Sequence, residues 1–197
     1  MSTIITDISQ LDENATYTYA DYLLWRIKER LELIKGKIFQ MSPTPSLRHQ
    51  QISGRLHLEM GQFFKNHHCQ IFYAPFDVRL SKQNPANTDR SIYTVVQPDL
   101  CIVCDENKLD ERGCLGAPDL VIEILSPGNS RKEMKDKFDL YEESGVREYW
   151  LVEPAEDAVF IYTLNEAGTY IGLKPAVDLL HSVIFPDLEI DLESIFR

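Results

Sequence analysis

The chain has 197 residues, of which 44% are hydrophobic and 26% charged, a balance typical of one globular domain and not of a disordered chain. Its formal net charge of -11 at pH 7 argues against a broad basic surface that binds nucleic acid, although it is compatible with a local basic rim. No apolar run reaches the roughly 18 residues of a membrane-spanning helix, and the N-terminus lacks the features of a signal peptide. We therefore expect one cytoplasmic domain over residues 1–197, with residues 1–16 as a loosely ordered extension.

In chain order, the first predicted element is a helix that begins after Thr18, an N-cap with Asp21 three residues on, and runs to about Glu29. The stretch "LELIKGKIFQM" predicts a hairpin around Lys35 and Gly36. A break at "SPTP" precedes a second helix from Ser46, with apolar residues at helical spacing at Ile52, Leu56, Met60 and Phe63. "CQIFYAPFDVRL" then predicts a strand that is irregular at Pro75.

The polar stretch "SKQNPANTDRS" predicts a long loop, and two strands follow, in "VVQPDLCIV" and "APDLVIEIL". A helix is predicted over Arg131–Ser144, with Gly145 directly after its end. Further strands are predicted in "REYWLVEP", "AVFIYTLN" and "TYIGLKP", before a short apolar stretch ending in "DLEIDLESIFR". Together these elements predict an α/β (α+β) domain, a mixed β-sheet flanked by helices.

The four cysteines, without a secretory context, predict reduced thiols. Cys101 and Cys104 form a C-x-x-C, but residues three apart on a strand point to opposite faces. We therefore expect core cysteines there, with a metal or redox pair as the alternative.

Two carboxylates lie in the segment "APDLVIEIL". Side chains alternate along a strand, so Asp119 and Glu123 share a face but lie roughly 13 Å apart, too far for one metal ion to bridge. Asp119 stands beside Pro118 at the strand entrance, where a capping or turn role is normal. Glu123 stands among aliphatic residues in mid-strand, where a buried ion pair is the alternative to a functional site.

Asp99, in the preceding strand segment, supplies a partner for Glu123. If the two segments are neighbouring strands, the two carboxylates meet across the sheet at roughly 5 Å. They repel one another unless a proton or a cation lies between them. An all-oxygen site of this kind suits Mg²⁺ or Mn²⁺ better than zinc. We therefore expect Asp99 and Glu123 to be metal ligands and Asp119 to be architectural.

An Asp on one strand followed by a Glu-x-Lys position on the next resembles the core of the PD-(D/E)xK nuclease superfamily. The wider pattern resembles its Uma-two family of restriction-type endonucleases, over about residues 17 to 196. The matching pieces are "ELIKGKI", "SP" with His49 following, "QPDL", "APDLVIEILSP" and "KFDLY" running into "GVREYWLVEP". The resemblance implies a restriction-endonuclease-like core, with Glu32 as the leading acidic residue, Asp99 as the motif aspartate and Glu123 as the motif glutamate.

The chain departs from the superfamily pattern at two positions. Leu125 stands where the superfamily has its lysine, and Glu133 stands where many family members carry an aspartate, so Glu133 is assigned no role. Met134, Phe138 and Tyr141 form one apolar stripe on the predicted helix. We expect Lys137 to supply the missing lysine, because it flanks this stripe and can bury its stem while its ammonium points inward. The alternative is an exposed pair between Lys137 and Glu133.

Other candidates have structural alternatives as well. Glu32 could be an exposed strand carboxylate, and His49, a candidate substrate-binding residue, could be a surface or packing histidine. Arg131, Lys132 and Lys135 are candidate phosphate contacts, although they could form a solvated helix face balanced by nearby acidic residues.

The patterns together with this resemblance imply a magnesium- or manganese-dependent endonuclease that hydrolyses DNA, with Glu32, Asp99, Glu123 and Lys137 as catalytic residues. A homodimer is expected, since two sites related by a two-fold axis cut both strands most simply. Two alternatives stay open: an inactive nuclease fold kept as an interaction or dimerisation module, and a small-molecule phosphohydrolase, which better suits the negative charge.

Overall fold

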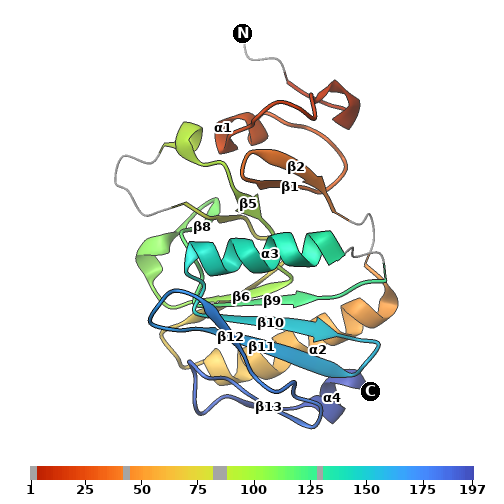
Figure 1. Cartoon of the computed structure of the whole chain (residues 1–197), viewed down its shortest axis with the longest axis vertical. Helices are drawn as coiled ribbons and strands as arrows, with labels where there is room; N and C mark the ends of the chain where they lie inside the picture. The colour runs from red at the N-terminus through yellow and green to blue at the C-terminus, as the bar shows by residue number, and fades with distance from the viewer. Residues whose placement is uncertain (1–3, 42–44, 82–87, 128–130) are drawn as a thin grey trace.

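The computed structural model describes residues 4–41, 45–81, 88–127 and 131–197 (Figure 1). Most of the break expected at "SPTP" and most of the loop expected at residues 81–91 lie outside the described residues. Among the helices of the described residues, none is both long and apolar enough to cross a membrane.

The strands form two six-stranded sheets and a two-stranded ribbon, where the sequence patterns predicted one mixed sheet. The first sheet has the order β2-β1-β5-β4-β8-β7, with bounds Lys37–Gln40, Leu31–Ile34, Val95–Val96, Val78–Arg79, Gly113–Leu115 and Leu109–Asp110. The second has the order β12-β11-β10-β9-β6-β3, with bounds Tyr170–Gly172, Ala158–Leu164, Glu148–Glu153, Leu120–Ile124, Leu100–Val103 and Gln70–Tyr73. The ribbon pairs β13 (Leu179–His181) with β14 (Glu189–Asp191).

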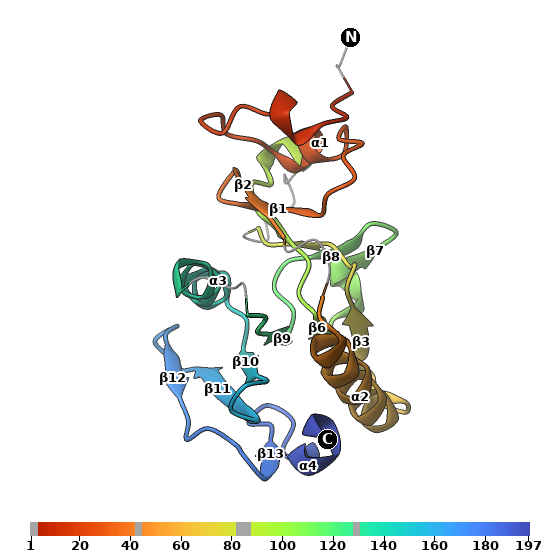
Figure 2. The same ribbon diagram turned by 90° about the vertical axis from the view of Figure 1, so that its right-hand side faces the viewer.

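Helices α2 (Leu47–Phe64) and α3 (Arg131–Ser144) lie on opposite sides of the second sheet (Figure 2). The alternation of side chains along β9 explains this arrangement. Leu120, Ile122 and Ile124 join the core that contains α2 and the C-terminal helix α4 (Leu192–Phe196). Val121, on the other face, joins the core that contains α3. Odd-numbered residues of β9, Glu123 included, therefore face α3.

The chain crosses from the first sheet to the second between β5 and β6. The predicted strand "VVQPDLCIV" is thus two strands, interrupted at Gln97, Pro98 and Asp99. Proline lacks the N–H that a ladder needs, which is a physical reason for the interruption at this point. The crossing places Asp99 directly before β6, within reach of the neighbouring strand β9.

Several predicted elements are confirmed. The hairpin β1–β2 turns at Lys35 and Gly36, which both have positive φ (52° and 77°), as a tight two-residue turn requires. Helix α2 begins after its N-cap Ser46, whose Oγ accepts the His49 N–H at 3.1 Å. Helix α3 has the predicted bounds, and Gly145 follows it with φ 84°.

The first helix is much shorter than predicted. Thr18 and Asp21 form the expected capping box, but α1 covers only Tyr19–Tyr22 and does not reach Glu29. The chain leaves the helix to pair with the N-terminal segment, because the Arg26 N–H donates to the Ile5 carbonyl at 2.6 Å. Short 3₁₀ turns complete the described backbone, η1 at Ile8–Gln10, η2 at Asp89–Ser91 and η3 at Glu106–Lys108.

The prediction for the cysteines was wrong in part. Cys69 and Cys104 form a disulfide, whereas Cys101 and Cys114 are free and buried, as expected of core cysteines. Strands β3 and β6 pair antiparallel with Gln70 opposite Val103, and the same register places Cys69 opposite Cys104. The pairing depends on which strands are neighbours, so the spacing of the cysteines along the chain does not reveal it.

Candidate active site

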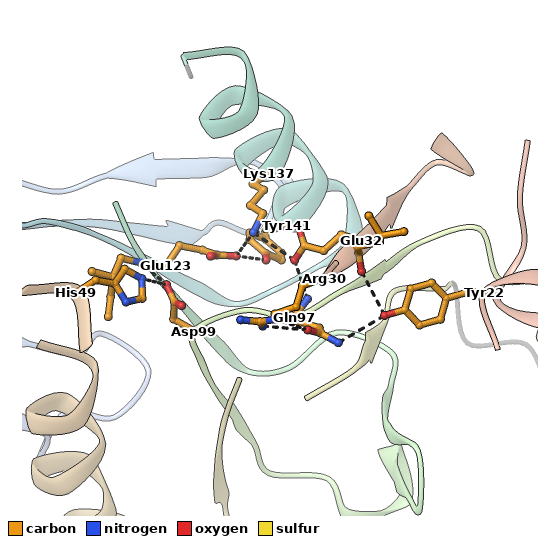
Figure 3. A network of polar contacts seen from close by, with 11 residues as sticks. Tyr22, Arg30, Glu32, His49, Gln97, Asp99, Glu123, Lys137 and Tyr141 are labelled. Carbon is orange, nitrogen blue, oxygen red and sulfur yellow. Dashed lines mark hydrogen bonds and ion pairs between the residues drawn. The ribbon is translucent and has the colours of Figure 1, made fainter. Parts of the chain in front are cut away.

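Glu123 is the centre of a buried polar cluster between β9 and α3 (Figure 3). Its Oε1 atom accepts a hydrogen bond from Lys137 Nζ at 2.9 Å and another from the Tyr141 hydroxyl at 2.6 Å. Lys137 and Tyr141 are one helical turn apart on α3, so they present their polar groups to the same point. The ammonium of Lys137 thus points inward, as expected, and the alternative of an exposed lysine is wrong because its side chain is only 10% exposed.

Glu32 joins the cluster from the first sheet. It lies on β1 with a side chain that is 3% exposed, so the alternative of an exposed strand carboxylate is wrong. Its Oε2 is 3.3 Å from Lys137 Nζ, and its Oε1 accepts the backbone N–H of Gln97 at 2.7 Å. Lys137 therefore bridges carboxylates from both sheets.

Asp99 lies across from Glu123. Strands β6 and β9 pair antiparallel with Leu100 opposite Ile122, and continuing this register by one residue places Asp99 opposite Glu123. The expectation that the two segments are neighbouring strands is therefore confirmed. Asp99 Oδ2 accepts the Ile124 N–H at 2.8 Å and lies 3.2 Å from Nε2 of His49, which is buried on α2.

Burial and neighbouring charges shift the pKa values of the cluster. Burial raises the pKa of Glu123 to about 7, although Lys137 pulls it down, and the negative charges of Asp99 and Glu32 add to the rise. Burial opposes the charged form of Lys137, but Glu123 and Glu32 outweigh it and raise its pKa, so the ammonium stays charged. Burial also opposes a charged His49, yet its hydrogen bond to Asp99 leaves its pKa raised.

A small cavity of about 70 Å³ lies between these groups. Four carboxylates, those of Glu32, Asp99, Glu123 and Glu133, line it against two cationic side chains, Lys137 and Arg30. The excess of negative charge and the raised pKa of Glu123 mean that a further cation would be stabilised there.

The donor atoms fit a hard divalent cation. The hydrogen bonds described above reach Asp99 at Oδ2 and Glu123 at Oε1, so Asp99 Oδ1 and Glu123 Oε2 are the oxygens that would meet an ion. Carboxylate oxygens on facing strands are the ligands that Mg²⁺ and Mn²⁺ prefer. Asp99 and Glu123 would hold such an ion.

Asp119 lies away from this cluster, at the entrance of β9. Its Oδ2 accepts the Cys104 N–H at 2.9 Å and its Oδ1 lies 3.2 Å from the Arg147 guanidinium. These contacts fix the connection between β6 and β9, which is the architectural position expected of it.

The basic residues at the start of α3 do not line the cavity. Arg131, Lys132 and Lys135 are exposed, and Lys135 pairs with Asp139 on the same helix. His49, in contrast, does line the cavity, and the alternative of a surface histidine is wrong because it is buried. A role of any of the four in substrate binding stays a prediction.

Two members of the cluster were missed from the sequence. Tyr141 was assigned to the apolar stripe of α3, although its place one turn after Lys137 could have indicated the shared contact. Arg30 donates to Gln97 Oε1 at 2.9 Å and lines the cavity; its position two residues before Glu32 was an available signal, since strand side chains alternate.

A larger pocket of about 350 Å³ adjoins the cavity and shares Arg30, His49 and Asp99 with it. Helix α2 forms one wall with Gly54 and His57, and Tyr73 at the end of β3 lies at the rim with 60% of its surface exposed. The rings of His57 and Tyr73 meet edge to face with centroids 4.7 Å apart.

The chain is similar to known proteins over most of its length. The chain is 27% identical to an uncharacterised protein of Synechocystis sp. (strain ATCC 27184 / PCC 6803 / Kazusa) over 179 residues, covering 82% of this chain and 89% of the relative. It shares its fold with a crystal structure titled as a "putative nuclease belonging to DUF820" from Anabaena variabilis ATCC 29413. That structure has a TM-score of 0.70 and 22% identity, and the match covers 91% of this chain and 97% of the other.

A family model described as "Putative restriction endonuclease" matches residues 19–193, which include every residue of the polar cluster. The resemblance drawn from the sequence motifs is thereby confirmed, and the chain belongs to the Uma2 family.

Proposed function

We propose that this protein is a metal-dependent endonuclease that hydrolyses phosphodiester bonds of DNA. The observation that carries the proposal is the arrangement of three side chains. Asp99 and Glu123 face one another on neighbouring strands, and Lys137 Nζ lies 2.9 Å from Glu123. Membership in a family described as restriction endonucleases supports the same reaction class.

Mg²⁺ or Mn²⁺, when bound by Asp99 and Glu123, would polarise the scissile phosphate and lower the pKa of an attacking water. Lys137 stays protonated because its pKa is raised, so it acts as a fixed positive charge beside the phosphate and does not act as a base. Glu32 orients Lys137 from the opposite side, and His49 holds Asp99 through the contact at 3.2 Å.

The adjoining pocket suits the nucleoside next to the scissile bond. It shares Asp99 and His49 with the metal-ligand cavity, and the exposed ring of Tyr73 offers a base a surface for stacking. Arg30 lines both spaces and carries a guanidinium, which binds phosphate oxygens well. Arg131, Lys132 and Lys135 would contact the phosphate backbone farther from the cut.

A small-molecule phosphohydrolase is the second candidate, and the net charge of -11 favours it, because a long polyanion is repelled more than a small one. A non-catalytic interaction module is the third. The buried charges of Glu32, Glu123 and Lys137 count against it, since a fold without a site gains little from keeping them.

A homodimer remains our expectation for a protein that cuts both strands, and a cytoplasmic location remains our expectation for an enzyme that acts on cellular DNA. Light scattering at tens of micromolar, roughly the range of weak dimers, would count against the dimer if it gave a monomer of 22.7 kDa.

The test of the function is cleavage of supercoiled and linear DNA with Mg²⁺ or Mn²⁺, with and without a chelator. Nicked or linear product should form only with metal, and Glu123→Gln and Asp99→Asn should abolish it. Equal cleavage in the presence of chelator, or a fully active Glu123→Gln, contradicts the mechanism. Hydrolysis of a small phosphodiester without any action on DNA selects the second candidate.

A further inference from the structure

A second group of metal-ligating side chains lies at the opposite end of β6 from Asp99. His67, His68 and Cys69 directly precede β3, and the ligand atoms of these three residues all lie within 4.8 Å of one another. Cys104, just after β6, is joined to Cys69 by the disulfide, so its sulfur belongs to the same group. Both histidines are exposed, and the group lines a cavity of about 520 Å³ that an ion can reach from solvent.

The spacing of one histidine and one cysteine matches that of a tetrahedral centre. His68 Nε2 lies 3.5 Å from Cys69 Sγ. Bond lengths of about 2.3 Å to sulfur and 2.0–2.1 Å to nitrogen place two ligand atoms of a tetrahedral Zn²⁺ about 3.6 Å apart. His67 Nδ1 accepts the Cys69 N–H at 3.1 Å, which holds the ring beside the cysteine; this hydrogen bond must break if Nδ1 is the atom that binds the metal.

We propose that the reduced protein binds one Zn²⁺ through His67, His68, Cys69 and Cys104, and that the Cys69–Cys104 disulfide is the metal-free form. Two thiolates and two imidazoles are a donor set that zinc prefers, unlike the carboxylates of the proposed active site. The two sites are therefore chemically distinct and would take different ions.

Reduction of the disulfide, followed by binding of Zn²⁺, converts the metal-free form into the zinc form. A dithiol reductant gives two electrons and two protons to the disulfide, which becomes the thiols of Cys69 and Cys104, while the reductant closes to its own disulfide. Binding of Zn²⁺ then releases the two thiol protons, and the neutral histidines each donate a lone pair. Two negative thiolates and one divalent cation leave the centre without net charge.

Either form links the same parts of the fold. Cys69 connects α2 to β3, and Cys104 ends β6, the strand paired with β3. A disulfide and a shared zinc ion both hold these neighbouring strand ends together. The redox state would therefore change metal occupancy while the sheet edge stays cross-linked.

Cobalt is a spectroscopic probe for this site, because Co²⁺ bound tetrahedrally by thiolates gives intense visible bands and thiolate-to-metal charge transfer. The full-length protein, reduced with a phosphine that binds zinc weakly, should show both signals at one Co²⁺ per chain. Added Zn²⁺ should remove them, and protein oxidised to the disulfide should show neither. Measuring in the Glu123→Gln background keeps the result independent of the proposed nuclease site.

Variants locate the ligands. Cys104→Ser and His68→Ala should each weaken Co²⁺ binding at least tenfold, and His67→Ala should do the same. Because both histidines are exposed, their variants should fold even if loss of Cys104 does not. His181→Ala, an exposed histidine on β13, is the matched control and should bind as the wild type does. Absent charge transfer in the reduced protein, or equal binding by His68→Ala, overturns the proposal.

Discussion

Lys137 Nζ lies 2.9 Å from Glu123 and 3.3 Å from Glu32, so one buried ammonium pairs with carboxylates from two different sheets. Removing that ammonium leaves buried negative charge without a counter-charge, which is more costly than the pair itself is stabilising. The cluster thus links the stability of the metal-free protein to the residue that we assign to catalysis.

Lys137→Met should lower the free energy of unfolding of the metal-free protein by roughly 3 kcal/mol and abolish DNA cleavage. The double variant Lys137→Met, Glu123→Gln should be more stable than Lys137→Met alone, because the buried negative charge of Glu123 is also removed. Denaturant unfolding and plasmid nicking measure the two effects.

Lys135→Met is the matched control on the same helix. Lys135 is 72% exposed and forms a surface pair with Asp139, so its loss should change stability and cleavage little. An active, stable Lys137→Met would show that the inward ammonium serves neither role.

The inward orientation of Lys137 could be predicted because it depends only on the sequence of α3 and of the strand directly before it. Helix α3 follows β9 directly and packs back on it, and the helical period places Lys137 on the inner side. The buried face of α3 is rotated about the helix axis relative to the predicted apolar stripe. Leu140 and Tyr141 are buried with Lys137, whereas Met134 and Phe138 are only partly buried.

Features that depend on distant strands could not be predicted in the same way. The change of sheet at Pro98 lies inside a segment whose composition is continuous with a strand. The disulfide depends on the register of β3 and β6. The early end of α1 depends on the pairing of Arg26 with Ile5, which no local helical pattern includes.

Asp119→Asn should separate architecture from metal binding. The variant weakens the contacts to the Cys104 N–H and to Arg147, so the free energy of unfolding should fall by about 1 kcal/mol. Mn²⁺ affinity, measured by calorimetric titration, should stay at the wild-type value, while Asp99→Asn should lose it. Lost Mn²⁺ affinity in Asp119→Asn would make this residue part of the metal site.

Glu148 should give the stability of the protein a pH dependence. Its carboxylate is fully buried, and burial raises its pKa from 4.5 although the N–H groups of Val183 and Ile184 donate to it at 2.9 and 2.8 Å. The folded state therefore binds the proton more tightly than the unfolded chain does. The stabilisation by Glu148 is complete below 4.5 and is lost as the pH rises through the higher folded pKa.

The variant Glu148→Gln lacks this titration. The stability advantage of the wild type over Glu148→Gln should shrink as the pH rises from about 4 to about 8, in denaturant unfolding at each pH. An advantage that grows over this range would mean that the donated hydrogen bonds outweigh burial and lower the pKa.

Gly54 tests whether DNA uses the pocket beside the metal ligands. A Cβ atom built at this position meets nothing within 4 Å, and the residue lines the 350 Å³ pocket from the middle of α2. Gly54→Ala should stabilise the protein by up to about 1 kcal/mol, because alanine favours a helix more than glycine does. Gly54→Leu should instead fill the pocket and raise the KM for DNA roughly tenfold, a loss of about 1.4 kcal/mol of binding.

Gly61 provides the control for Gly54→Leu, since it lies on the same helix, has equally open space around a Cβ atom, and does not line the pocket. Gly61→Leu should leave KM unchanged, and Mn²⁺ affinity should be the same in both variants because neither contacts Asp99 or Glu123. A raised KM in Gly54→Leu alone therefore assigns the effect to the occupied pocket and not to a general change in α2. If Gly54→Leu cleaves DNA with the wild-type KM, the nucleoside beside the scissile phosphate lies elsewhere, and the role of Tyr73 as a stacking surface fails with it.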